Sequence, residues 1–116
     1  MGAADAPEAI RQNVYRLCTE LLDPLREGIG MPIRVNSGYR TPEHNRRVGG
    51  VANSDHLRGL AADIRFGDLP GARMGALLRE VIAREGLLFD QLIVYPTFVH
   101  ISYRPEETNR GQVILK

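Results

Sequence analysis

The sequence has little cysteine, little net charge and no long apolar run. A single cysteine, Cys18, excludes an internal disulfide. The formal net charge of +1 gives no general electrostatic reason to expect nucleic acid or an anionic membrane surface as a partner. No apolar stretch approaches the ~20 residues that cross a bilayer. The opening residues MGAADAPEAIRQ lack the basic and apolar regions of a secretory signal.

What is present is typical of a globular protein. Hydrophobic residues make up 43% of the chain and charged residues 25%. A length of 116 residues predicts a single domain over residues 1–116, with a modest core.

Three stretches have the apolar spacing or the end signals of helices. Residues 7–29 carry an apolar stripe that includes Cys18, which we interpret as a buried structural thiol. Pro24 is expected to kink or restart this helix. A Thr-Pro pair at 41–42 predicts the start of a short helix, and residues 67–86 form a second long one.

Strands alternate with these helices along the chain. They are predicted near residues 33–36, where the pattern is half-buried, and over 59–66, 89–95 and 98–103. Residues 51–56 are expected to be a loop, and the apolar tail 113–115 is a candidate to pack back on the domain. The pattern predicts an α+β fold, a small mainly antiparallel sheet with helices packed on one side.

One strand contains a charge where a buried residue is expected. Asp63 lies between Ala62 and Ile64, and a buried carboxylate without a partner is costly. A bound cation would remove this cost, and two histidines, His56 and His100, are candidates to share it. Two imidazoles, one carboxylate and an open fourth position are typical of a catalytic zinc site. The alternatives are histidines that are hydrogen-bonded in the core or at the surface, and an aspartate in a salt bridge.

The residues around Asp63 also form a longer motif. The segment SDHLRGLAAD, residues 54–63, has the fixed positions of the pattern Ser-x-His-x-x-Gly-x-Ala-x-Asp. This pattern is the signature of the peptidase M15 family, which the sequence resembles. VNSGYRTPEHNRRVGG before the motif and FDQLIVYPTFVHISY after it resemble the family's flanking segments. The resemblance therefore covers about residues 35–103.

The resemblance implies a minimal single-domain zinc metallopeptidase with its zinc site in a cleft at the sheet. It implies His56, Asp63 and His100 as zinc ligands, and Arg40 as the arginine that neutralises charge on the substrate carbonyl. Ser54 would hold the signature loop or contact substrate.

The implied function is hydrolysis of amide bonds in peptidoglycan stem peptides, by a D-Ala-D-Ala carboxypeptidase or an endopeptidase. We expect the cell wall or periplasm as the site of action, in a bacterial or an endolysin-like phage protein. Whether the enzyme removes terminal residues or cuts internal bonds stays open.

The sequence departs from the family at the proton-accepting group. In much of the family this acid lies three residues before the last histidine, where this chain has Thr97. Asp90 is the tentative replacement, and Tyr95 is a candidate proton donor. The alternative is a zinc-containing module that binds peptidoglycan without cleaving it. The arginines at 46–47, with Arg40 and Arg58, form a basic cluster that would meet substrate carboxylates or lie on a solvated helix face.

Overall fold

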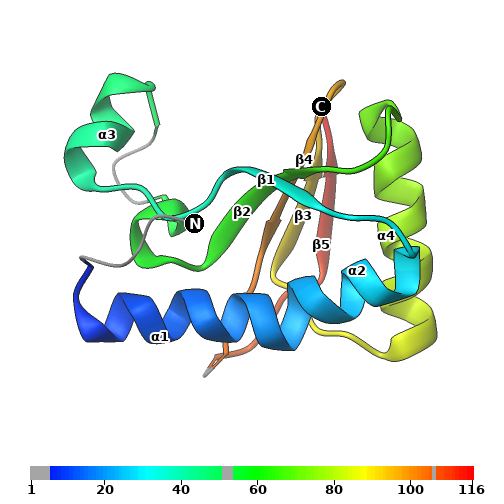
Figure 1. The fold of residues 1–116 in the computed structure, drawn as a ribbon, viewed down its shortest axis with the longest axis horizontal. Coiled ribbons are helices and arrows are strands. Elements are labelled where there is room, and N and C mark those ends of the chain that lie inside the picture. The colour runs from blue at the N-terminus through cyan, green and yellow to red at the C-terminus, as the bar shows by residue number, and fades with distance from the viewer. Residues whose placement is uncertain (1–5, 51–53, 106) are drawn as a thin grey trace.

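The fold combines short helices with one sheet (Figure 1). The computed structural model describes residues 6–50, 54–105 and 107–116. The helical elements are α1 (Glu8–Leu17), the π-helical turn η1 (Cys18–Leu22), α2 (Asp23–Ile29), α3 (Pro42–Arg47), the 3-10 turn η2 (Asp55–Arg58) and α4 (Gly71–Glu85). The strands are β1 (Arg34–Ser37), β2 (Ala61–Arg65), β3 (Gln91–Val94), β4 (Val99–Ser102) and β5 (Gln112–Leu115).

The sheet has the strand order β1-β2-β4-β3-β5. Its neighbouring strands are antiparallel, except that β5 runs parallel to β3. The predicted α+β class with a mainly antiparallel sheet is confirmed. The apolar tail does pack back, and it does so as a strand at the sheet edge.

The first predicted helix is interrupted just before Pro24. α1, η1 and α2 follow one another in Figure 1 as one long rod, and the Asp23 N–H donates to the Cys18 carbonyl five residues earlier. Proline has no N–H, and its ring collides with the carbonyl four residues back. The chain therefore makes one wide π-type turn before α2 begins. Cys18 is half-buried against the core, and burial raises the pKa of its thiol.

The core lies on one face of the sheet. α1, η1, α2 and α4 contribute its helical side, through buried residues such as Leu17, Leu25 and Leu78. On β2 the buried Ala62 and Ile64 belong to this core. Because side chains alternate along a strand, Asp63 points to the opposite face. That face is where the charged site of β2 and β4 is built.

Two sequence expectations differ from the structure. Val35 was expected on the apolar side of a half-buried strand, but it is 36% exposed because β1 is an edge strand of the sheet. Of the expected loop 51–56, residues 51–53 lie outside the described residues, and Asp55 and His56 belong to the helical turn η2. Within the described residues, no helix has both the length and the apolar character needed to cross a membrane.

Candidate metal centre

Strand pairing brings Asp63 and His100 together. They are directly opposite each other in the antiparallel pair of β2 and β4, so their side chains share one face of the sheet. His100 Nδ1 lies 2.9 Å from Asp63 Oδ1. The two residues lie 37 positions apart in the chain, and the strand register alone brings them together.

The turn η2 delivers His56 to the same carboxylate. Ser54 caps the turn, and its hydroxyl accepts a hydrogen bond from the His56 N–H at 3.2 Å. Gly59 ends the turn with φ +71°, a conformation that favours glycine. The chain then enters β2, and His56 Nε2 lies 3.2 Å from Asp63 Oδ1.

The tautomer of His56 follows from its second contact. Its ring is 3% exposed, and Nδ1 lies 2.7 Å from the Gly38 carbonyl. A carbonyl can only accept, so Nδ1 carries the proton. In the neutral ring Nε2 then presents a lone pair to a carboxylate oxygen. Two acceptors this close need a proton or a metal ion between them, and a histidine held by a backbone carbonyl is the usual form of a metal ligand.

The three side chains fit a metal ion as a set. His56, Asp63 and His100 each offer a ligand atom, and these atoms lie within 4.8 Å of one another. Ligands ~2.0–2.2 Å from a tetrahedral zinc ion lie roughly 3.3 Å apart, so small adjustments suffice. Burial by itself would raise the pKa of Asp63, but its contacts with the His100 and His56 rings outweigh it and hold this pKa below its usual value. The carboxylate is therefore ionised, as a metal ligand must be.

Arg40 borders the cluster on the side of β1. Its Nη2 lies 3.3 Å from Asp63 Oδ2, Nη1 lies 3.1 Å from Asn45 Oδ1 and Nε lies 3.0 Å from Ser37 Oγ. Gly50 packs directly on this arrangement, since a Cβ there would come within 2.0 Å of Asn45 Oδ1. The arginine is thus held at a defined position beside the candidate metal ligands.

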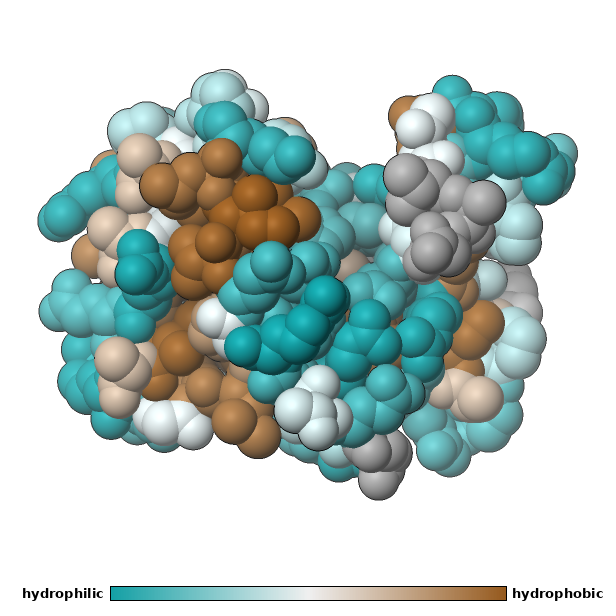
Figure 2. Space-filling view, turned by 180° about the vertical axis from the view of Figure 1, so that it is seen from behind, coloured by the Kyte–Doolittle hydropathy of each residue, from teal (hydrophilic) through white to brown (hydrophobic). Residues whose placement is uncertain are grey.

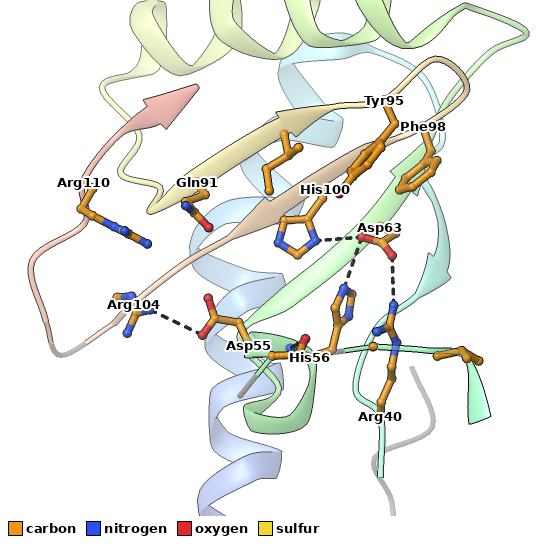
Figure 3. Close-up of a pocket in the computed structure, with 14 residues that line it drawn as sticks. Arg40, Asp55, His56, Asp63, Gln91, Tyr95, Phe98, His100, Arg104 and Arg110 are labelled. Atoms are coloured by element: carbon orange, nitrogen blue, oxygen red, sulfur yellow. Dashed lines mark hydrogen bonds and ion pairs between the residues drawn. The ribbon is translucent and has the colours of Figure 1, made fainter. Parts of the chain in front are cut away.

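These groups line an open pocket of about 550 Å³. Figure 2 shows the surface from behind, hollowed between the lobe that carries α3 and the rest of the molecule. Figure 3 shows the lining side chains, with His100, Asp63 and His56 between Arg40 on one side and Arg104 on the other. Tyr95 and Phe98 form a stacked pair with ring centroids 4.5 Å apart in the pocket wall.

The candidates for the proton-accepting group lie elsewhere. Thr97 is exposed in the turn between β3 and β4, and Asp90 is 0% exposed beneath two arginines. Hydrogen bonds from Arg110 lower the pKa of Asp90, which makes it a weak base. Neither residue is among the described residues that line the pocket, whereas Tyr95 is. The contacts of Asp90 therefore support a structural role, against the tentative catalytic one.

The expected basic cluster does not assemble as one surface. Arg46 and Arg47 are exposed on α3, and Arg58 pairs with Asp55 and Glu107. The arginines that line the pocket are instead Arg40, Arg104 and Arg110.

Several residues that line the pocket were not identified from the sequence as pocket residues, although Tyr95 was named as a candidate proton donor. Gln91 and Tyr95 follow from strand alternation, because they share the face of Ile93, which pairs with His100. Asp55 stands inside the signature at a variable position. Arg104 and Arg110 come from the polar tail, whose path no local pattern predicts.

Fold and site together define a candidate metallopeptidase, with two histidines and one aspartate around an open pocket. A family model described as Peptidase M15 matches residues 2–102. The chain therefore belongs to the peptidase M15 family, as the signature predicted, and the zinc metallopeptidase class expected for it is confirmed at the level of the family.

A curated relative matches part of the chain. Over 47 residues the chain is 45% identical to a zinc D-Ala-D-Ala carboxypeptidase of Streptomyces albus G. The matched stretch is 40% of this chain and 18% of that protein. The relative is thus similar in a segment, and most of its length has no counterpart in this match.

Proposed function

We propose that the protein is a zinc-dependent peptidase that hydrolyses amide bonds in peptidoglycan peptides, as a D-Ala-D-Ala carboxypeptidase or an endopeptidase. The observation that carries the proposal is the convergence of His56, Asp63 and His100 within 4.8 Å beside an open pocket. Family membership supports the reaction class, and the carboxypeptidase name of the relative supports the substrate class.

The proposed ligand atoms are His56 Nε2, His100 Nδ1 and a carboxylate oxygen of Asp63. When bound, zinc supplies Lewis acidity, which polarises a carbonyl and makes water more acidic. The protein contributes orientation, because the Gly38 carbonyl holds the His56 ring and Arg40 holds the second oxygen of Asp63. The donors are thus arranged before any substrate binds.

Arg40 is proposed to bind the substrate carbonyl. Its guanidinium stays protonated and offers a planar set of donors where negative charge develops. Its three contacts to Ser37, Asn45 and Asp63 fix its plane at the pocket wall. Ser54 lines the same pocket and is proposed to position His56 through the cap and to contact substrate.

A second candidate function is a zinc-containing module that binds peptidoglycan without cleaving it. The observation that favours it concerns the missing base: Thr97 stands where much of the family has an acid, and its tentative replacement, Asp90, is paired with arginines. A positioned base contributes roughly 10²–10⁴ in rate, so its loss would weaken catalysis severely.

One experiment separates the two functions. Zinc-loaded protein is incubated with purified muropeptides, and new fragments are sought by mass spectrometry. We expect fragments that disappear with a chelator and in His100→Ala, while His44→Ala, an exposed histidine on α3, retains activity. Binding of muropeptides with no fragments would establish the module instead. No zinc bound at equimolar level would contradict both.

A further inference from the structure

Two arginines and an amide lie at the end of the pocket that the proposed reaction does not use. Figure 3 shows Arg104, Arg110 and Gln91 on the opposite side of His100 from Arg40, with the Arg110 guanidinium directed toward the pocket. All three line the pocket. They come from β3 and from the segment that joins β4 to β5, outside the family signature.

A buried carboxylate holds both arginines in place. Asp90 is 0% exposed, and its Oδ2 lies 2.8 Å from Arg110 Nη2 and 3.0 Å from Arg104 Nε. Its Oδ1 accepts from Arg110 Nε and from the Arg110 backbone N–H, both at 3.1 Å. Arg110 is therefore fixed at its backbone and along one edge of its guanidinium. A fixed donor loses little entropy when it binds a ligand.

Arg110 keeps unused donors on its other edge. Its side chain is 53% exposed, and among the described residues no hydrogen bond uses Nη1. Arg104 differs, because its Nη1 contacts Glu107 and its Nη2 contacts Asp55. Arg110 is thus the group in this part of the pocket that can bind a ligand directly, and Arg104 shapes the wall beside it.

The free edge of Arg110 is the feature that favours an anion, because Asp90 and Asp55 offset the charge of Arg104 and Asp63 offsets that of Arg40. The described side chains that line it include three arginines but two aspartates, and one of these, Asp63, is a proposed metal ligand. A divalent cation at the metal centre would increase the positive charge. A guanidinium with a free edge binds a carboxylate through two parallel hydrogen bonds.

Strand register places this anion relative to the reacting bond. Ile93 pairs with His100, and Gln91 lies two residues before Ile93 on the same face of β3. Two residues of strand span roughly 7 Å, which is also about the length of two extended residues of a peptide. A group near Gln91 therefore lies about two residues from the bond at the metal centre, on the side of the pocket that Arg110 also lines.

We propose that Arg110, fixed by Asp90 and flanked by Arg104 and Gln91, is a carboxylate-binding subsite that selects peptides with a free carboxylate about two residues from the bond that is cut. This specificity rests on the proposed peptidase function.

The test first modifies the peptide substrate and then substitutes Arg110 in the protein. The bond cut in a stem peptide is mapped by mass spectrometry, and each free carboxylate of that peptide is then converted in turn to a carboxamide. We expect one conversion, about two residues from the cut, to raise KM roughly tenfold or more. With Arg110→Gln, the KM of the unmodified peptide should rise by the same factor. Converting the same carboxylate to a carboxamide should then raise the KM of this variant no further.

Matched variants separate a subsite from a general loss of charge or fold. Arg46→Gln removes an exposed arginine outside the described pocket lining and should behave as wild type. Arg110→Lys keeps the charge but lacks the planar pair of donors, so its KM should lie between those of wild type and Arg110→Gln. Circular dichroism and thermal unfolding show whether each variant is folded. Equal KM values for the parent and all converted peptides with wild-type protein would overturn the subsite without using any variant.

Binding to the zinc-free protein, measured by calorimetry, keeps the subsite testable without turnover. In one outcome, the zinc-free protein binds the peptide with the free carboxylate at least about tenfold more tightly than its carboxamide, and the zinc-loaded protein cleaves neither. This result would support the subsite and contradict the proposed function. Cleavage of both at equal kcat/KM would contradict the subsite and leave the function intact. If the zinc-free protein binds neither peptide and the zinc-loaded protein cleaves neither, the subsite is also overturned.

Discussion

At the scale of single residues, Asp63 is the side chain on which the proposed metal centre depends. One of its oxygens contacts both histidines, and the other contacts Arg40. These four groups come from β2, β4, η2 and the segment after β1. A substitution at Asp63 should therefore weaken metal binding more than it lowers the stability of the fold.

Asp63→Asn tests this dependence. The amide keeps the shape of the side chain but removes its charge, so we expect zinc affinity to fall at least about 100-fold. Competition between the protein and a chromophoric chelator measures the change. Asp68→Asn, at an exposed position, is the matched control and should keep wild-type affinity. Unchanged zinc binding in Asp63→Asn would remove this residue from the metal centre.

Asp90 is a second residue whose charge has a predictable effect. Hydrogen bonds from Arg110 hold the pKa of Asp90 below its usual value, so the folded protein binds this proton less readily than the unfolded chain. Its stabilisation is complete well above pH ~4, the unfolded value, and is lost as the pH falls toward the lower folded pKa. Asp90→Asn should lower the free energy of unfolding by ~1–3 kcal/mol at pH 6, with a smaller difference at pH 3.

Urea unfolding of both proteins at several pH values measures this difference. Asp68→Asn again serves as the control, because an exposed carboxylate should change stability little. A difference between Asp90→Asn and wild type that stays constant from pH 6 to pH 3 would show that the ionised carboxylate is not what stabilises the fold.

At the scale of secondary-structure elements, the proposed metal centre depends most on the position of the turn η2. It carries His56, and the strand β2 follows the turn along the chain. Gly59 joins the two and packs closely on α1, where an added Cβ would lie 2.7 Å from Val14 Cγ2 and 3.0 Å from the Ile10 carbonyl. The helix α1 therefore supports the metal centre without contributing a ligand.

Gly59→Ala tests this support. The substitution combines the strain of φ +71° with a collision against α1, so we expect a loss of roughly 2–4 kcal/mol in the free energy of unfolding. Gly30→Ala is the matched control, because Gly30 has φ +75° and no atom within 4 Å of the added Cβ. It should lose only ~1 kcal/mol. Equal losses in the two variants, measured by urea unfolding, would mean that the contact between Gly59 and α1 does not contribute to stability.

At the scale of the whole molecule, the residues that stabilise the fold and the residues of the proposed active site lie on opposite faces of the sheet. Helices cover one face of the sheet with the apolar core, and the other face carries the charged pocket. Metal binding should stabilise the fold, because the three proposed ligands come from two strands and a turn that unfolding would separate.

Zinc at about 100 times its dissociation constant should stabilise the protein by ~2.7 kcal/mol and raise Tm by on the order of 10 °C. Differential scanning calorimetry with and without zinc measures the shift. His100→Ala should lose the shift, whereas His44→Ala should keep it. A shift of the same size in His100→Ala would place the stabilising ion elsewhere.

The sequence alone predicted the α+β class, the order of the main elements and the three residues that converge. These features are local or carried by a motif: helical and alternating apolar spacing, the family signature over residues 54–63, and an aspartate inside an apolar strand. The helices, strands and turns depend on residues close together in the chain, so spacing is sufficient to find them. His100 lies 37 positions from Asp63, and the complete ligand set was implied only by the resemblance to the peptidase M15 family.

Tertiary structure alone decided which charges meet. It paired Asp90 with Arg104 and Arg110, and it brought two arginines of the tail to the pocket in place of Arg46 and Arg47. These outcomes depend on the register between strands and on the path of β5 beside β3. Ion pairs between distant residues form wherever packing places them, and no local pattern in the chain encodes that choice.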